Sequence, residues 1–327
     1  MPRARLGRVW VGGDGEPVRL VGVINVSPES FFKGSVRRTV DEVLKAAEAM
    51  ISSGVDVIDV GGMSTAPYNK TVISVDEEVS RVVPVIKALR REFPELTISV
   101  DTFRSRVAEE ALNAGANVIN DVTGLKGDGD MARVISNHGG ASVIIMARER
   151  VSGQGGDPVS RTVSALRESL EIALGNGIDE GGIVIDPGIG AWPPLSMDPI
   201  LTGGEPLRGG DYIRGDNTYP WYSWDSIIIM NINKIRSELN RPVLVGISRK
   251  SFLERLMRRR APPEERLFAS VSAEAIAVLM GADAVRTHNV SESRDAVKVA
   301  EALRLCLNKD SSMCNNELVK LVGVGNR

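Results

Sequence analysis

Acidic, amide and basic side chains recur where short Val/Ile-rich runs of this chain end. Asp101, Asn120, Asp186 and Lys250 each stand at or near the end of such a run, and Asp186 also precedes a Pro-Gly-Ile-Gly turn that leaves little side-chain bulk beside a ligand. A single acid before a helix is often only its N-cap, so Asp101 gains weight from the other three. Two carboxylates, an amide and an amine brought together would surround a polar, planar ring rich in hydrogen-bond donors.

A second group of residues suits an anion. Arg286 and His288 end the last run, and Asn25 ends the first. A guanidinium donates two parallel hydrogen bonds to phosphate oxygens, and phosphate sites in α/β barrels often involve the last two strands. These three residues are therefore expected to hold an anionic leaving group. With only two histidines in the chain, a His-rich metal site is excluded. The absence of a Gly-x-Ser-x-Gly sequence disfavours a Ser-His-Asp hydrolase.

Eight apolar runs, each followed by a helical pattern, would position these residues. Short continuous apolar runs suit strands that are buried on both faces, as parallel strands are. Eight βα units in unbroken order predict a single-domain (β/α)₈ TIM barrel, whose strands all end at one rim. A doubly wound open sheet is the alternative. The runs cover residues 21–25, 55–60, 98–101, 117–121, 142–146, 183–186, 243–250 and 284–288.

Apolar residues at helical spacing fill the segments between these runs. Thr39 with Glu42, and Ser74 with Glu77, form capping boxes in front of two such segments. Those two helices should run over about 40–51 and 75–89, and the others over about 104–114, 130–138, 159–177, 226–239, 263–281 and 291–307.

One segment, residues 191–225, interrupts this alternation with several glycines and prolines and with three of the four tryptophans, Trp192, Trp221 and Trp224. A long loop without regular structure of its own is usually functional or disordered, and aromatic clusters favour burial. We expect a lid or partner surface on the catalytic rim. The alternative is a loop packed outside the barrel or at a dimer contact. The barrel should occupy residues 1–308, with 309–327 as a polar, poorly ordered tail.

The overall composition excludes several classes of function. A formal net charge of −2 disfavours a dedicated nucleic-acid binder, and the basic stretch Arg255–Arg260 is interpreted as a solvated helix end or subunit contact. The chain has no apolar run of the roughly 20 residues that span a membrane, and no secretory signal follows Met1. A cytoplasmic protein with small-molecule substrates is expected. Cys306 is read as a small buried hydrophobe, and a bridge to Cys314 is the alternative.

Seven segments, in order, resemble motifs of the dihydropteroate synthase family. The resemblance extends over roughly residues 19 to 305, and the pattern is most like that of archaeal-type members. The segments are Asn25-Val-Ser-Pro-Glu-Ser-Phe31, Asp59-Val-Gly-Gly-Met-Ser-Thr-Ala-Pro67, Ser99-Val-Asp-Thr102, Ile119-Asn-Asp-Val122, Asp186-Pro-Gly-Ile-Gly190, Ser248-Arg-Lys-Ser-Phe252 and Arg286-Thr-His288.

This resemblance implies a transferase that joins 6-hydroxymethyl-7,8-dihydropterin pyrophosphate to an arylamine and releases pyrophosphate, in folate or related pterin-cofactor synthesis. Pyrophosphate would leave first, and a carboxylate such as Asp101 would stabilise the pterin cation. Mg²⁺, with Asn25 as its protein ligand, would neutralise the leaving charge. The resemblance also implies a homodimer.

The implied site residues fall into sets by ligand. Asp101, Lys250, Asn25 and His288 would be catalytic. Asp101, Asn120, Met146, Asp186, Lys250 and Arg286 would bind the pterin. The pyrophosphate would contact Asn25, Arg286 and His288, and the arylamine Ser64, Thr65, Pro67 and Ser251.

The loops around the arylamine depart from the family pattern. Ser64-Thr-Ala-Pro-Tyr68 lacks the arginine of the usual Ser-Thr-Arg-Pro-Gly, and Ala191-Trp-Pro replaces Phe-Gly-Lys. We hypothesise that the pterin is kept while the acceptor is a larger or phosphorylated 4-aminobenzoate derivative, with Lys33 for its added anionic group. The alternatives are a pterin-dependent methyltransferase, which needs no Ser-Arg-Lys-Ser element, and a pterin-binding protein without catalysis, which needs no pyrophosphate residues.

Overall fold

Eight parallel strands form the centre of the molecule in a computed structural model that describes residues 1–27, 32–37, 39–66, 72–151, 156–190, 192–205, 207, 219–307 and 309–322. Their order in the sheet is β8-β7-β6-β5-β4-β3-β10-β9. All eight strand predictions are confirmed. The strands are β3 (Arg19–Asn25), β4 (Val57–Gly61), β5 (Thr97–Asp101), β6 (Val118–Asp121), β7 (Ser142–Met146), β8 (Ile183–Asp186), β9 (Leu244–Gly246) and β10 (Ala284–Thr287).

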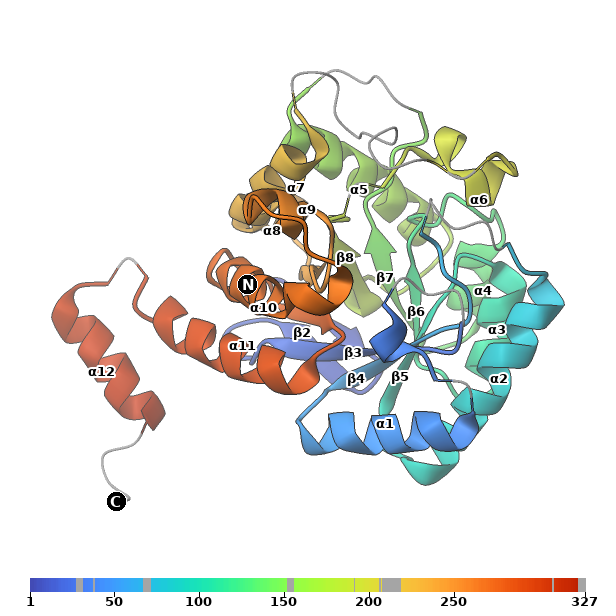
Figure 1. Cartoon of the computed structure of the whole chain (residues 1–327), viewed down its shortest axis with the longest axis horizontal. Coiled ribbons are helices and arrows are strands. Elements are labelled where there is room, and N and C mark those ends of the chain that lie inside the picture. Colours follow the sequence, from blue (N-terminus) through green and yellow to red (C-terminus); the bar gives the residue numbers. More distant parts are fainter. Residues whose placement is uncertain are drawn as a thin grey trace.

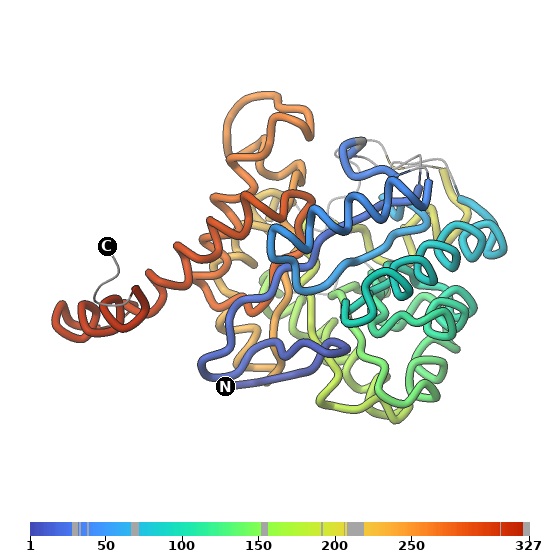
Figure 2. Tube along the Cα trace, turned by 90° about the horizontal axis from the view of Figure 1, so that it is seen from below, coloured from blue at the N-terminus to red at the C-terminus, as the bar shows by residue number. Residues whose placement is uncertain are grey.

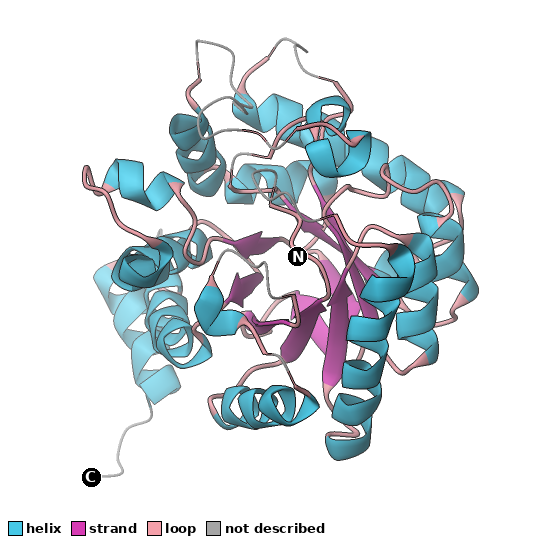
Figure 3. Ribbon diagram, turned by 45° about the vertical axis from the view of Figure 1, so that its right-hand side comes forward, coloured by secondary structure: helices cyan, strands magenta, loops and turns pink. Residues whose placement is uncertain are grey.

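The sheet closes on itself. β8 and β9, at the two ends of the strand order, meet through a parallel bridge between Ile185 and Val243. The amide of Ile185 also donates to the carbonyl of Pro242 at 3.0 Å. The predicted TIM barrel is therefore confirmed and the open sheet is wrong. Figure 3 shows the strands around the centre, with the helices outside them.

The register of neighbouring strands brings their polar ends to one level. Asp101 pairs with Gly61 on one side and with Asn120 on the other. On the next two strands beyond β6, Met146 pairs with Asp186. Gly61, Asp101, Met146 and Asp186 end their strands and Asn120 is the last residue but one of β6, so these positions belong to the C-terminal rim.

Helices of the outer layer follow the strands (Figure 1). The two predicted caps are present, because Thr39 Oγ1 accepts from the Glu42 amide at 3.2 Å and Ser74 Oγ from the Glu77 amide at 3.1 Å. The helices are α1 (Val40–Ser52), α2 (Val75–Glu92), α3 (Ser105–Asn113), α4 (Met131–Asn137), α5 (Pro158–Gly175), α6 (Pro199–Thr202), α7 (Trp221–Met230), α8 (Ile232–Leu239), α9 (Phe252–Leu256), α10 (Leu267–Leu279) and α11 (Val290–Arg304).

The segment 191–225 is more regular at its ends than predicted. A short 3₁₀ turn at Leu195–Met197 leads into α6, and α7 begins at Trp221 rather than at 226, directly after Pro220. Trp224 is 1% exposed, with the guanidinium of Arg161 lying 4.6 Å from its ring centroid. The alternative prediction, that this segment packs on the outside of the barrel, is therefore correct for Trp224.

A hairpin of β1 (Arg3–Leu6) and β2 (Val9–Gly12), which the sequence analysis did not predict, covers the opposite end of the barrel. Ala4, Leu6 and Val11 pack in one apolar cluster with residues at the beginnings of several barrel strands, among them Val21 and Val57. This hairpin fills the N-terminal end of the barrel, and the cavity described below therefore opens only from the C-terminal rim in the described part of the chain.

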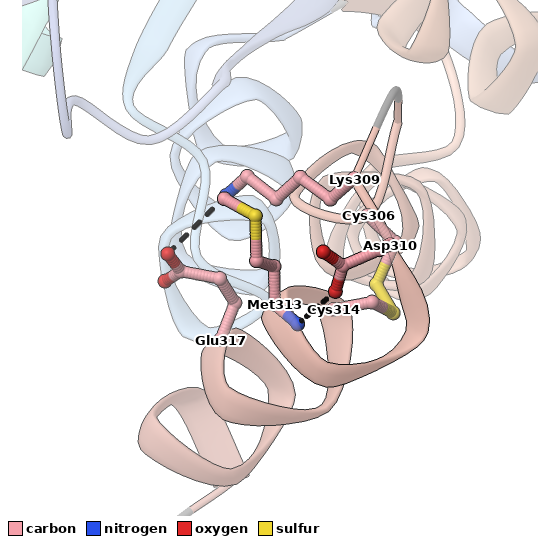
Figure 4. Close-up of a disulfide and its surroundings, with 6 residues drawn as sticks. All are labelled: Cys306, Lys309, Asp310, Met313, Cys314 and Glu317. Carbon is pink, nitrogen blue, oxygen red and sulfur yellow. Dashed lines mark hydrogen bonds and ion pairs between the residues drawn. A yellow bond between two sulfur atoms is a disulfide. The ribbon is translucent and has the colours of Figure 1, made fainter.

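The C-terminal segment is a helix, α12 (Ser311–Val322), rather than an irregular tail. It extends away from the barrel in both views (Figures 1 and 2). A disulfide between Cys306 and Cys314 joins α12 to the end of α11 (Figure 4). The bridge that the sequence left as an alternative is thus present, and Cys306 is a half-buried disulfide partner instead of a buried hydrophobe. Among the described residues, no helix is both long and apolar enough to cross a membrane.

Candidate active site

A cavity of about 410 Å³ opens at the C-terminal rim of the barrel. Strand ends and the loops that follow them form its wall. Of the residues predicted from the sequence, eight line it: Asn25, Ser64, Thr65, Asp101, Lys250, Ser251, Arg286 and His288. The predicted strand-end residues among them thus share one cavity with the predicted loop residues Ser64, Thr65 and Ser251, while their roles stay predictions.

Arg286 links two carboxylates at the base of this cavity. Its Nη2 donates to Asp101 Oδ2 at 2.8 Å, and its Nε donates to Asp59 Oδ2 at 2.7 Å. Asn120 Nδ2 donates to the same Asp59 oxygen at 3.1 Å. Four side chains from β4, β5, β6 and β10 thus form one hydrogen-bonded network that fixes their orientation.

Asp59 was missing from the predicted site. It lies in the middle of β4 and is fully buried, whereas the prediction looked for polar side chains at strand ends and in the loops that follow them. A sequence signal was available, because Val55-Asp-Val-Ile-Asp-Val60 places an acid inside an apolar run. A buried charge in such a position needs a partner, and Arg286 supplies it.

One carboxylate oxygen of Asp101, a residue of the cavity wall, is buried without a hydrogen-bond partner among the described residues. Its Oδ2 accepts from Arg286, whereas its Oδ1 has no hydrogen-bond partner among the described residues. Burial raises the pKa of Asp101 to about 7, against the lowering effect of Arg286 and with a further increase from Asp59. The carboxyl is therefore close to its titration point near neutral pH, a property more common at functional sites than elsewhere.

His288 is neutral at physiological pH. Burial, together with the positive charges of Arg286, Arg249 and Lys250, lowers its pKa to about 3. Its Nδ1 lies 3.1 Å from Ser248 Oγ, and its ring meets that of Phe32 edge to face at 5.3 Å. His288 can thus exchange hydrogen bonds with an anion but does not contribute a charge to it.

Lys250 reaches across the cavity toward the turn that follows β8. Its ammonium donates to the carbonyl of Ile189 and lies 5.6 Å from the ring centroid of Trp192. Gly190 has φ +118°, and a Cβ there would come within 2.7 Å of Lys250 Cδ. The Pro-Gly-Ile-Gly turn is therefore required both for its backbone conformation and for the space that the lysine occupies.

Trp192 is a second residue that the predicted site omitted. It lines the cavity, and the guanidinium of Arg148 lies 5.2 Å from its ring centroid. Arg148 is itself buried and donates to Asp198 Oδ2 at 2.7 Å, so it ties the segment after β8 to the end of β7. The indole Nε1 has no hydrogen-bond partner among the described residues. Trp192 thus adds a large planar ring to the cavity wall.

Three predicted pterin residues lie beneath the cavity wall rather than in it. Asn120, Met146 and Asp186 are 3%, 2% and 8% exposed, and Asp186 Oδ1 accepts from the Gly188 amide at 2.7 Å. The negative charge of Asp186 also acts to raise the pKa of Arg286. Their contact with a ligand stays a prediction. Pro67 and the side chain of Lys33 lie outside the described residues.

The residues around Asn25 fit a metal ion that arrives with an anionic substrate. Asn25 Nδ2 donates to Ser35 Oγ at 2.7 Å, which leaves its carbonyl oxygen as the remaining polar group. Within the described part of the chain, no three His, Cys, Asp or Glu side chains gather as a metal site requires. Mg²⁺ commonly takes one protein oxygen and completes its shell with phosphate oxygens and water.

Comparisons with known proteins agree on one family. The family described as pterin binding enzyme matches residues 21–197 and 224–288. Dihydropteroate synthase of Bacillus subtilis is 35% identical over 288 residues, which are 88% of this chain and 89% of that protein.

Solved structures give the same result. Dihydropteroate synthase of Coxiella burnetii in complex with pteroic acid has a TM-score of 0.75 at 31% identity, over 93% of this chain and 99% of that one. The Burkholderia cenocepacia enzyme complexed with 7,8-dihydropteroate has a TM-score of 0.72 at 27% identity, over 93% of this chain and 97% of that one.

Proposed function

Because this chain belongs to the dihydropteroate synthase family, we propose that its rim cavity is the place where the family's two substrates are joined. The protein is a transferase that condenses 6-hydroxymethyl-7,8-dihydropterin pyrophosphate with an arylamine in folate synthesis and releases pyrophosphate. The observation that carries the assignment to this cavity is Asp101, whose Oδ1 has no partner among the described residues while Arg286 holds Oδ2.

The pterin ring would be held by side chains from the strand ends, namely Asp101, Asn120, Met146, Asp186, Lys250 and Arg286. The ring has several N–H donors, and Asp101 Oδ1 is a buried acceptor that has no partner among the described residues. When the bond from the pterin methylene carbon to the pyrophosphate oxygen breaks, positive charge develops on the pterin. An ionised Asp101 beside the ring stabilises that charge, in a site whose polar groups are already oriented.

Arg286, His288 and Asn25 would bind the pyrophosphate. Arg286 remains cationic because the negative charges of Asp59 and Asp101 raise its pKa despite burial. His288 is neutral and would donate or accept a single hydrogen bond. Mg²⁺, held by Asn25 and the pyrophosphate, would supply the charge that His288 does not.

The arylamine would enter between Ser64 and Thr65 on one side and Ser251 on the other, with Pro67 adjacent in sequence. Its nitrogen attacks the methylene carbon, forms the new C–N bond and loses one proton. Ala66 leaves the β4 side of this entrance without charge, and Trp192 places a large ring in the same cavity. This entrance departs from the family pattern, and on that departure rests our proposal that the acceptor is larger than 4-aminobenzoate and carries an added anionic group.

A homodimer and a cytoplasmic location are part of the same proposal. Phe268 is 80% and Ile276 43% exposed, two apolar residues eight apart on α10 that would be covered by a second copy. A multiply charged pyrophosphate ester is costly to transfer into an apolar phase, so its enzyme is expected where the ester is made.

Isothermal titration followed by an activity assay tests this function. Pterin pyrophosphate should bind more tightly with Mg²⁺ than without, and addition of an arylamine should release pyrophosphate. Binding without release for every amine offered would instead identify a pterin-binding protein. A Lys250→Ala variant with unaltered turnover would remove the cavity from consideration.

A further inference from the structure

A second cavity, of about 780 Å³, lies beside the loop that joins α9 to α10. Five arginines line it, namely Arg255, Arg258, Arg259, Arg260 and Arg266, together with one acid, Glu254. In Figure 2 this loop, coloured orange, stands at the same end of the molecule as the blue loop that follows β3. The cavity therefore belongs to the catalytic end of the barrel.

Most of this positive charge has no internal partner. Arg266 pairs with Glu254 at 2.8 Å, and Arg259 pairs with Glu265 at 2.7 Å. Arg255, Arg258 and Arg260 form no ion pair with any residue that the structure describes. Three unpaired guanidinium groups around one concave surface repel each other unless an anion lies between them.

The backbone of this loop is held in an unfavourable conformation. Arg258 has φ +55°, in the left-handed region that residues with a side chain seldom adopt. Such residues persist where the surroundings or a function require them. The interpretation of this stretch as a simple solvated helix end explains neither the concave surface nor this conformation.

Arg266 forms a common wall between this cavity and the rim cavity. Its guanidinium is buried and fixed, because Nη1 donates to the Arg249 carbonyl at 2.9 Å and Nε to the Ala261 carbonyl at 2.7 Å. The neighbouring lining of the rim cavity consists of Ser251 and Pro263, on the side where the arylamine would enter. A ligand that extends past Ser251 would therefore meet the arginines.

We propose that the arginine cavity binds an anionic extension of the acceptor arylamine, either a phosphate or a pair of carboxylates. Guanidinium groups bind both chemistries through paired hydrogen bonds. The extension takes no part in bond formation, since the amine nitrogen attacks at the other end of the acceptor. This inference rests on the proposed function and names the substrate class that its acceptor site selects.

Binding to the full chain tests the inference independently of turnover. Two synthetic arylamines serve as probes, 4-aminobenzoyl-phosphoethanolamine and 4-aminobenzoyl-ethanolamine, which differ only in the phosphate. 4-Aminobenzoyl-glutamate offers two carboxylates instead. Each is titrated in the presence of 6-hydroxymethyl-7,8-dihydropterin, which lacks the leaving group, so that no reaction occurs. The variant is Arg258→Gln with Arg260→Gln. Its control, Arg167→Gln, removes an exposed arginine on α5.

The wild-type chain should bind at least one anionic probe about tenfold or more tightly than the neutral probe, since a charged hydrogen bond contributes about that factor. The double variant should bring this ratio close to one, and the control should keep it. The anionic probe that binds more tightly identifies the extension. Equal binding of all three probes by the wild type, or a ratio that the double variant leaves unchanged, would overturn the inference. Failure to release pyrophosphate with any amine would instead overturn the proposed function, while the binding ratio still decides this inference.

Discussion

The guanidinium of Arg286 donates to Asp101 Oδ2 at 2.8 Å, although β4 and β3 lie between their strands in the barrel. The same guanidinium binds Asp59 on β4, so the pair is held from two directions. This arrangement joins the residue expected to stabilise the pterin with the residue expected to bind pyrophosphate. We therefore predict that loss of the leaving group and stabilisation of the resulting cation are coupled through one side chain.

Activity should increase with pH around neutrality. Burial raises the pKa of Asp101 to about 7, and only the ionised carboxylate stabilises a pterin cation. The value of kcat/KM for the pterin substrate should therefore be low below pH 7 and level off above it, because this quantity reports groups of the free enzyme. An Asp101→Asn variant should lack this rising limb. The same limb in the variant would assign it to another group.

Replacement of Asp59 by Asn should weaken substrate binding. Arg286 would lose one of its two carboxylate partners, and the network that orients Arg286 and Asn120 at the base of the cavity would be held less firmly. KM for pterin pyrophosphate should increase at least tenfold, with a smaller change in kcat. Asp56→Asn is the matched control, because Asp56 immediately precedes β4 at its opposite end. Identical KM values for the two variants would exclude this role of Asp59.

Gly190→Ala should impair both activity and folding. The new Cβ would lie 2.7 Å from Lys250 Cδ, and φ +118° is unfavourable for alanine. A fall in kcat/KM of about tenfold or more is expected together with a lower Tm. Gly139→Ala should be neutral, since nothing lies within 4 Å of a Cβ at that position. A fully active Gly190→Ala enzyme would show that Lys250 does not need this space.

Glu274 should make the protein less stable as pH rises. Burial raises its pKa to about 7, whereas the ordinary value is 4.5. Between these values the folded state keeps a proton that the unfolded state has lost, so stability falls by about 3 kcal/mol over this interval and stays lower above it. Glu274→Gln should thus gain stability relative to wild type from pH 4.5 to 8. Urea unfolding of both proteins at pH 4.5 and pH 8 measures the difference between their free energies of unfolding. A difference that does not change with pH would contradict the prediction.

The barrel and its rim could be predicted from sequence because parallel strands buried on both faces give continuous apolar runs. The hairpin β1-β2 could not, since its strands have four residues each and include polar side chains such as Arg3 and Arg5. The bridge between Cys306 and Cys314 was undecided because spacing alone does not determine whether two cysteines meet.

From the residue pattern, the candidate site could be predicted where side chains stand at strand ends, and the family resemblance added the loop residues Ser64, Thr65 and Ser251. Asp59 was missed because it lies one layer deeper, in the middle of an apolar run. Trp192 was assigned to a loop, and its position in the cavity depends on the buried pair of Arg148 and Asp198, which are 50 residues apart. Contacts over such separations leave no local pattern in the sequence.

The most direct test of the account follows pyrophosphate and the condensation product together in the wild-type enzyme and in Asp101→Asn. With pterin pyrophosphate, Mg²⁺ and an arylamine, the wild type should form both in equal amounts. The variant should be slower by about a hundredfold or more, as expected when a group that stabilises transition-state charge is removed. Unaltered turnover in Asp101→Asn would contradict the account, because the carboxylate held by Arg286 would then play no part in the reaction.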